Sequence, residues 1–216
     1  MKTGILFDLD GTLLNTWDDL TDAVNHTLEA FGCPARTPAE IRSFLGNGPR
    51  NLIQRSLPGQ ADDPDLDAVF TAYQAWYADH ANIKTRPYDG ILESLAELKK
   101  NYPIAIVSNK SDGPVKALCR DYFGADIFAL GETDDCPRKP APDMLYKAMA
   151  AIGVEKCIYV GDSEVDIQVA KNAGMPCLTV LWGFRDEDYL QANGAEHICA
   201  DPKDLAKTLK ELIENG

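Results

Sequence analysis

The chain has 216 residues, of which 45% are hydrophobic, so it can bury a substantial core and does not have the composition of a disordered chain. Its formal net charge of −13, from 34 acidic and 21 basic residues, argues against nucleic acid as a partner, because phosphate backbones are bound by clustered Lys and Arg. No run of about 18 apolar residues could span a membrane, and the N-terminal sequence reaches an acidic residue at Asp8, too early for a signal peptide. We therefore expect a cytoplasmic protein without a membrane partner.

The N-terminal part of the chain predicts one strand followed by a block of helices. Residues 5–7 form a short apolar run that is typical of a buried strand. Helical patterns follow over residues 18–31, 38–45, 49–57 and 64–81. In the first of these helices Leu20, Val24 and Leu28 share one stripe, so we expect residues 16–82 to form a small helical domain with its own core.

From residue 83 onward, predicted helices alternate with predicted strands. The helices cover residues 91–100, 113–122, 142–152, 165–173 and 204–214, and the strands cover residues 104–108, 127–130, 157–160, 176–181 and 197–199. Single helices between strands favour parallel pairing through right-handed crossovers. The sequence therefore predicts an α/β fold, in which residues 1–15 and 83–216 form a doubly wound, Rossmann-like parallel sheet and the helical domain is inserted after the first strand.

Two carboxylates, Asp8 and Asp10, follow the first predicted strand. In an extended chain residues i and i+2 share a face, unless the strand ends between them and the turn re-aims the second. Two negative charges this close need a cation, a proton or hydrogen bonds, and without a nearby His or Arg in sequence a divalent metal is the natural candidate. Because Asp-x-Asp-Gly is also common in ordinary turns, this motif alone leaves both interpretations open.

Two further strand ends carry polar groups that suit a phosphate. Ser108 lies at the end of the strand over residues 104–108, with Asn109 and Lys110 behind it, and a hydroxyl and a backbone N–H there could hold a phosphoryl oxygen. A Ser-Asn pair also leads into helices, which is the alternative. Lys139, fixed before Pro140 at a helix start, offers a cation for phosphate and carboxylates, unless it belongs to a solvated Arg-Lys pair.

The last motif places Asp162 after the strand over residues 157–160 and Asp166 at the start of the next helix. The helix dipole favours carboxylates in a first turn in any case. Asp162 nevertheless follows its strand as Asp8 follows the first one, so the two should meet at one edge of a parallel sheet. Three or four carboxylates around one point indicate Mg²⁺, which prefers oxygen ligands at about 2.0–2.1 Å.

The ordered set Asp8-Leu-Asp-Gly-Thr, Ser108, Lys139-Pro and Gly161-Asp-Ser-Glu-Val-Asp166 resembles the haloacid dehalogenase superfamily of phosphohydrolases. The resemblance covers essentially the whole chain, and the helical insert is similar to the cap of one subgroup. Within that subgroup the chain most resembles the phosphoglycolate phosphatases, through Gly46-Asn-Gly-Pro-Arg50, Ser108-Asn-Lys and the late Trp182-Gly-Phe-Arg.

This resemblance implies a mechanism for the hydrolysis of a small phosphate monoester. Asp8 would be the nucleophile that forms an aspartyl-phosphate, and Asp10 the general acid and base. Asp8, the backbone carbonyl of Asp10 and Asp162 would ligate Mg²⁺, with Asp166 positioning ligands or waters. Ser108 and Asn109, together with Lys139, would hold the transferring phosphoryl group.

The substrate is open at this stage, with 2-phosphoglycolate as the first candidate. Arg50 could bind its carboxylate from the cap, or could be a solvated Arg at a helix N-terminus. A sugar phosphate, a nucleotide or pyrophosphate is the alternative substrate, and a phosphosugar mutase the alternative enzyme. A receiver-like module that carries a phospho-aspartate is the alternative class, although Asp10 and the large cap argue against it. We expect a monomer or a homodimer.

Overall fold

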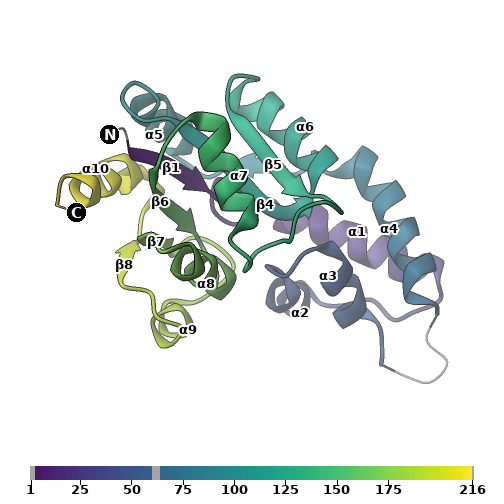
Figure 1. The fold of residues 1–216 in the computed structure, drawn as a ribbon. Coiled ribbons are helices and arrows are strands. Elements are labelled where there is room, and N and C mark those ends of the chain that lie inside the picture. Colours follow the sequence, from purple (N-terminus) through teal and green to yellow (C-terminus); the bar gives the residue numbers. More distant parts are fainter. Residues whose placement is uncertain (1–2, 60–63, 216) are drawn as a thin grey trace.

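The computed structural model describes residues 3–59 and 64–215, and its centre is a six-stranded sheet in which all neighbouring strands are parallel (Figure 1). Its strands are β1 (Thr3–Phe7), β4 (Ile104–Ser111), β5 (Phe128–Glu132), β6 (Lys156–Gly161), β7 (Cys177–Val180) and β8 (His197–Cys199). The spatial order is β5-β4-β1-β6-β7-β8, so the chain builds outward from β1 in one direction and then in the other. The predicted doubly wound α/β sheet is therefore confirmed, and the strand order reverses at β1.

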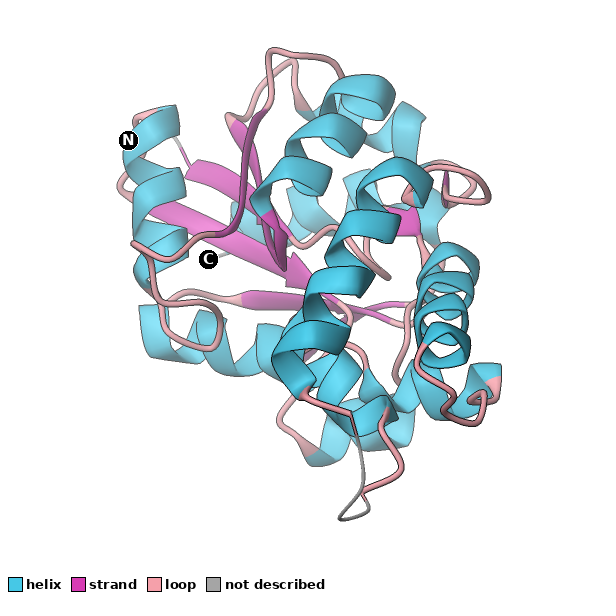
Figure 2. Cartoon of the chain, turned by 90° about the vertical axis from the view of Figure 1, so that its right-hand side faces the viewer, coloured by secondary structure: helices cyan, strands magenta, loops and turns pink. Residues whose placement is uncertain are grey.

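Helices cover both faces of this sheet (Figure 2) because both faces are apolar. Along β1, Ile5 and Phe7 pack against the helices of one face and Leu6 against those of the other. The first face carries α5 (Ile91–Leu98), α6 (Asp112–Phe123) and α10 (Leu205–Asn215), and the second carries α7 (Asp143–Ile152) and α8 (Glu164–Ala173). No helix within the described residues is long and apolar enough to cross a membrane.

A separate helical unit lies beyond the carboxyl ends of the strands (Figure 1). It consists of α1 (Trp17–Ala30), α2 (Pro38–Phe44), α3 (Pro49–Ser56) and α4 (Leu66–His80). The stripe of Leu20, Val24 and Leu28 on α1 is buried, as predicted, and packs against α4 in a hydrophobic cluster distinct from those of the sheet. One residue from the sheet domain, Phe184, joins that cluster.

Two connections join the helical unit to the sheet domain, and they pair with each other as the short strands β2 (Leu14–Asn15) and β3 (Arg86–Pro87). Beside them the buried carboxylate of Asp19 accepts hydrogen bonds from the backbone N–H groups of residues 83–85 at 2.8 to 3.0 Å. These hydrogen bonds hold residues 83–85, where the chain returns to the sheet domain, against α1, so the two connections lie side by side.

The structure differs from the sequence prediction in three places. The strands β2 and β3 were not predicted, and neither was the short helix α9 (Glu187–Ala192). The strand β4 continues to Ser111, beyond the predicted end at residue 108, and its pairing with β5 shifts register between Val107 and Ser111. Ser108 therefore lies within the last part of a strand and not after it.

Candidate active site

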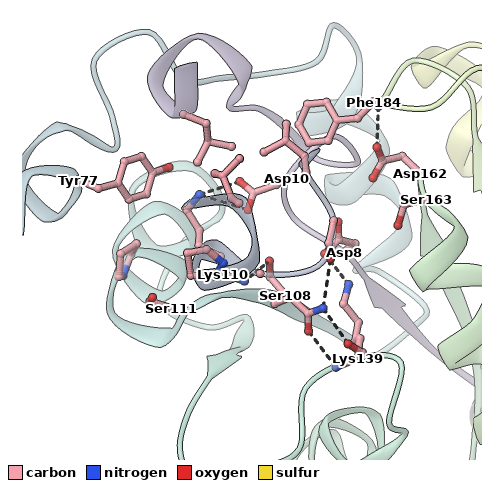
Figure 3. A pocket seen from close by; sticks show the side chains of 18 of the residues that line it. Asp8, Asp10, Tyr77, Ser108, Lys110, Ser111, Lys139, Asp162, Ser163 and Phe184 are labelled. Carbon is pink, nitrogen blue, oxygen red and sulfur yellow. Dashed lines mark hydrogen bonds and ion pairs between the residues drawn. The ribbon is translucent and has the colours of Figure 1, made fainter. Parts of the chain in front are cut away.

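The polar motifs of the sequence meet at the reversal point of the sheet, where parallel sheets bind ligands. Asp8 follows β1, Ser108 lies in the last part of β4 and Asp162 follows β6, and these strands are neighbours. All three residues line one cavity of about 250 Å³ between the sheet and the helical unit (Figure 3). The predicted convergence of these residues is therefore what the structure shows.

Three buried carboxylates line this cavity. Asp8, Asp162 and Asp166 each place an oxygen within 4.8 Å of the others. Burial, with the negative charges of Asp166 and Asp162, raises the pKa of Asp8 well above its ordinary value, although Lys139 opposes the rise. Burial and the charge of Asp166 raise the pKa of Asp162 to about 7. The cluster therefore resists carrying three negative charges unless further positive charge is supplied.

Lys139 supplies part of that positive charge. Its Nζ lies 2.8 Å from an oxygen of Asp8, 2.8 Å from one of Asp166 and 2.8 Å from the hydroxyl of Tyr159, so each of its three N–H groups has a partner. Burial disfavours the charged amine, but the carboxylates of Asp166 and Asp8 outweigh it and raise the pKa of Lys139. Lys139 is therefore a cation held against Asp8.

Asn109 fixes the backbone of Lys139 in turn. Its side-chain carbonyl accepts a hydrogen bond from the N–H of Lys139 at 2.9 Å, and its amide donates to the carbonyl of Lys139 at 2.9 Å. The same amide donates to the carbonyl of Gly46 in the helical unit at 3.2 Å. The side chain that was predicted to bind phosphate thus holds the backbone of Lys139 in place.

Asp162 is held from two sides. The backbone N–H of Phe184 donates to its Oδ2 at 2.7 Å, and the hydroxyl of Thr12 to its Oδ1 at 3.3 Å. Two glycines pack directly on this carboxylate, since a Cβ built at Gly11 or at Gly183 would collide with it. The surroundings therefore fix Asp162 in one orientation.

This arrangement fits a divalent metal ion. The donor set is entirely oxygen, as hard cations such as Mg²⁺ prefer, and a cation there would offset the buried negative charge that raises the pKa values of Asp8 and Asp162. Asp166 is less available than the other two, because each of its oxygens already accepts two hydrogen bonds, Oδ1 from Lys139 and Tyr159 and Oδ2 from the N–H and the hydroxyl of Ser163. Asp166 lies in the first turn of α8, as predicted, and it positions the cluster through Ser163 and Lys139.

Asp10 stands apart from the three clustered carboxylates. The chain turns after Leu9, and the carboxylate of Asp10 forms an ion pair with Lys110, at 2.9 and 3.2 Å from its Nζ. Its side chain is 17% exposed, whereas that of Lys110 is 5% exposed. Figure 3 shows Asp10 on the same side of the cavity as Lys110 and Tyr77. The turn therefore aims Asp10 away from Asp8, one of the two alternatives that the sequence left open.

Arg50 does not reach this site. It lies in the first turn of α3, where its guanidinium is 2.5 Å from the carboxylate of Asp67 and lies over the ring of Phe70. Pro49 and Leu52 line the cavity, and Arg50 does not. Residues three apart share a helix face, so the turn that points Pro49 and Leu52 inward points Arg50 outward. The structure therefore gives no support to the predicted contact of Arg50 with substrate.

The loop after β7 joins the sheet domain to the helical unit through hydrogen bonds. Arg185 pairs with Glu164 at 2.9 Å and donates hydrogen bonds to the carbonyls of Arg42 and Leu45 in the helical unit. Arg42 donates back to the carbonyl of Gly183 at 3.0 Å. These reciprocal contacts hold the helical unit over the carboxylates.

Several residues that line or hold this site have no role that the sequence alone predicted: Thr12, Tyr77, Lys110, Tyr159, Phe184 and Arg185. Thr12, Lys110 and the segment that contains Phe184 and Arg185 lie within motifs that the sequence shows, although no role was predicted for these side chains. In the helix predicted over residues 64–81, Val69, Tyr73, Trp76 and Tyr77 share one stripe, where a core position is the natural interpretation.

Known proteins resemble this chain over most of its length. Residues 5–180 match the family described as haloacid dehalogenase-like hydrolase. A phosphoglycolate phosphatase from Mesorhizobium japonicum is 36% identical over 190 residues, which cover 84% of this chain and 84% of that protein. A crystal structure from Lactobacillus delbrueckii subsp. bulgaricus, provisionally assigned as a phosphoglycolate phosphatase, is 36% identical with a TM-score of 0.86, and covers 97% of this chain and 99% of that one. CbbY from Rhodobacter sphaeroides, solved in complex with phosphate, is 27% identical with a TM-score of 0.80, and covers 97% and 100%.

Proposed function

The chain belongs to the haloacid dehalogenase-like hydrolase family and is a phosphatase, and from this we propose that it hydrolyses 2-phosphoglycolate, with Mg²⁺ as cofactor and Asp8 as the residue that is phosphorylated. The observation that carries the proposal is the buried carboxylate of Asp8, which Lys139 holds at 2.8 Å at the centre of an all-oxygen cluster. Such a carboxylate is oriented, shielded from water and placed beside positive charge, as a nucleophile toward phosphorus must be.

In the first step an oxygen of Asp8 attacks the phosphorus, and the bond between phosphorus and the ester oxygen breaks. Asp10 enters this step in its protonated form and gives its proton to the departing alkoxide, and the water of the second step returns a proton to it. In the second step Asp10 takes a proton from a water molecule, whose oxygen attacks the phosphorus of phospho-Asp8 and releases inorganic phosphate and free Asp8. Because Asp10 is turned away from Asp8 and lies toward the helical unit, it is on the side where the organic half of the substrate would sit.

Other groups of the chain would stabilise the charge of the transferring phosphoryl group. Asp8, Asp162 and the backbone carbonyl of Asp10 would hold Mg²⁺, which would neutralise the carboxylates and polarise the phosphoryl oxygens. Ser108, through its hydroxyl, and the backbone of Asn109 would donate hydrogen bonds to those oxygens. Lys139 would contribute through its charge, and it remains paired with Asp8 and Asp166.

We further propose that residues 16–82 form a cap that opens and closes on the sheet domain about the β2–β3 connections. The contacts of Arg185 with the cap support a closed arrangement in the present structure. Closure would exclude bulk water from the first step and surround the organic half of the substrate.

The proposal is tested by phosphate release from 2-phosphoglycolate, sugar phosphates, nucleotides and pyrophosphate, with and without Mg²⁺. Wild type is compared with Asp8→Asn and with a matched surface control, Asp126→Asn, whose carboxylate is 69% exposed. We expect a preference for 2-phosphoglycolate that EDTA and Asp8→Asn abolish and that Asp126→Asn leaves unchanged. Equal activity on all esters would overturn the substrate, and a long-lived phospho-Asp8 without ester turnover would indicate a phospho-aspartate switch.

A further inference from the structure

The cations of the cavity come from the sheet domain and not from the cap. Among the described residues that line the cavity, the basic ones are Lys110, Lys139 and Arg185. Lys139 is held by Asp8 and Asp166, and Arg185 by Glu164 and cap carbonyls. Lys110 is therefore the cation on the side of the cavity that the organic half of a substrate would occupy.

Lys110 is placed between the general acid and the cap. Its Nζ lies 2.9 Å from Asp10 and 4.7 Å from the centre of the Tyr77 ring on α4. An ammonium has three N–H donors, and the two oxygens of Asp10 are its only hydrogen-bond acceptors among the described residues. The amine can therefore serve a second anion without leaving Asp10.

Tyr77 brings a second polar group to the same place. Its side chain is 4% exposed and lines the cavity, yet its hydroxyl has no hydrogen-bond partner in the part of the chain that the structure describes. Figure 3 shows the Tyr77 ring pointing toward Lys110 and Asp10. A buried hydroxyl without a partner is costly in a folded protein, so its retention inside a ligand cavity indicates a ligand atom that it binds.

We propose that Lys110 and Tyr77 form an anion subsite that binds a carboxylate on the carbon next to the ester oxygen of the substrate. This inference rests on the proposed phosphatase function and adds to it the residues that select the substrate. To protonate the leaving oxygen, Asp10 must come within about 2.6–3.2 Å of it. In 2-phosphoglycolate one CH₂ group separates that oxygen from the carboxylate, so the carboxylate must lie close to Asp10, where Lys110 and Tyr77 are.

The subsite also accounts for discrimination between esters. An ester whose organic half carries no charge offers no charged acceptor to the Tyr77 hydroxyl or to the third N–H of Lys110. These buried donors would remain without a partner, which disfavours binding of such an ester. A carboxylate one carbon farther from the ester oxygen would be displaced from both groups. The structure thus assigns specificity for short 2-phosphono-oxy acids to one residue of the sheet domain and one of the cap.

The test compares 2-phosphoglycolate with ethyl phosphate, in which a methyl group replaces the carboxylate. The variants are Lys110→Met, which keeps the length of the side chain, and Tyr77→Phe, which keeps the ring. Lys116→Met and Tyr146→Phe are matched controls, because Lys116 pairs on the surface of α6 and Tyr146 is an exposed residue of α7. The quantity measured is kcat/KM for each substrate with Mg²⁺ present, and thermal unfolding checks that each variant is folded.

We expect wild type and both controls to prefer 2-phosphoglycolate. The ratio of the two kcat/KM values should fall about 100-fold in Lys110→Met and about 10-fold in Tyr77→Phe, as for the loss of charged and neutral hydrogen bonds to the substrate. Equal losses on both substrates would overturn the subsite, because a residue that only positions Asp10 or the fold affects both esters alike.

The two proposals fail in different ways. A wild type that hydrolyses both esters with similar kcat/KM refutes the anion subsite and leaves the phosphatase function intact, and this result does not depend on any variant being folded. A wild type that releases phosphate from neither ester refutes the proposed function itself.

Discussion

The metal-free protein should become less stable as the pH rises from about 5 to about 8, against the usual trend for a protein with paired carboxylates. Burial and the charge of Asp166 raise the pKa of Asp162 to about 7 in the folded state, whereas an unfolded Asp has a pKa of about 3.9. Between these values the folded state holds a proton that the unfolded state has lost. Stability is therefore greatest below the unfolded pKa and is lost as the pH approaches the folded pKa.

The size of the effect follows from the same two values. Each pH unit between them lowers the free energy of unfolding by about 1.4 kcal/mol, so the interval from pH 5 to pH 7 alone costs about 3 kcal/mol. The pKa of Asp8 is raised in the same direction, mainly by burial, and adds to the loss. Because a domain is stable by only about 5–15 kcal/mol, a loss of this size is readily measured.

Urea unfolding of EDTA-treated protein at several pH values is the assay, repeated with Mg²⁺ in excess. We expect the free energy of unfolding to fall with pH in EDTA and to recover with Mg²⁺, which binds the ionised carboxylates of the folded state only. The exposed carboxylates with lowered pKa values, Glu40 and Glu97 among them, change their contribution to stability mainly as the pH falls below the ordinary Glu pKa of about 4.3. They therefore do not mask the trend.

Asp162→Asn provides the decisive control, since it removes the titrating group and keeps the shape of the side chain. In this variant the metal-free protein should lose the part of the pH dependence that comes from Asp162, about 3 kcal/mol between pH 5 and pH 7, while the part that comes from Asp8 remains. A wild type whose metal-free stability is flat or rises over the same range would refute the reasoning, as would an equally steep fall in Asp162→Asn.

Three further predictions concern groups that hold the site in place. Lys139→Met should lower the free energy of unfolding in EDTA by about 3–5 kcal/mol, because it leaves a cluster of buried carboxylates without its cation; an unchanged urea midpoint would contradict this. Asp19→Ala should cost about 2–4 kcal/mol, since the backbone N–H groups of residues 83–85 lose a charged acceptor, and urea unfolding that matches wild type would show that water replaces it freely. Gly183→Ala should weaken Mg²⁺ binding, measured by calorimetry, at least about 10-fold, because the added Cβ collides with the carboxylate of Asp162. Gly113→Ala is the control, since a Cβ there meets no atom within 4 Å, and this variant should bind Mg²⁺ as wild type does.

The sheet and its carboxylates were predictable from the sequence because each depends on a local pattern. Apolar runs identified all six strands of the sheet, and the polar residues that follow those runs identified Asp8 and Asp162. Parallel pairing then brings the strand ends together without any knowledge of side-chain contacts. The same reasoning could not detect β2 and β3, since two residues are too few to show a period.

The ion pair of Asp10 with Lys110 was not predictable in this way. The two residues are 100 positions apart, and Lys110 belongs to the part of β4 that extends beyond the apolar run. The role of Phe184 was hidden for a different reason, because it holds Asp162 through its backbone N–H, which every residue except proline has. The start of α3 was predicted at residue 49, where it lies, but the outward direction of Arg50 depends on how α3 packs against α4, where its partners Asp67 and Phe70 are, and a local sequence pattern does not show this packing.

The loop after β7 connects the helical unit, the proposed cap, with the geometry of the carboxylate cluster. The side chain of Phe184 packs within the hydrophobic cluster of the cap, while its backbone N–H donates to Asp162 at 2.7 Å. The next residue, Arg185, donates to two carbonyls of the cap. Movement of the cap would therefore displace Phe184 and Arg185, and with them the N–H group that orients Asp162. Since a metal ion at the cluster would also fix Asp162, its binding and cap closure should each favour the other.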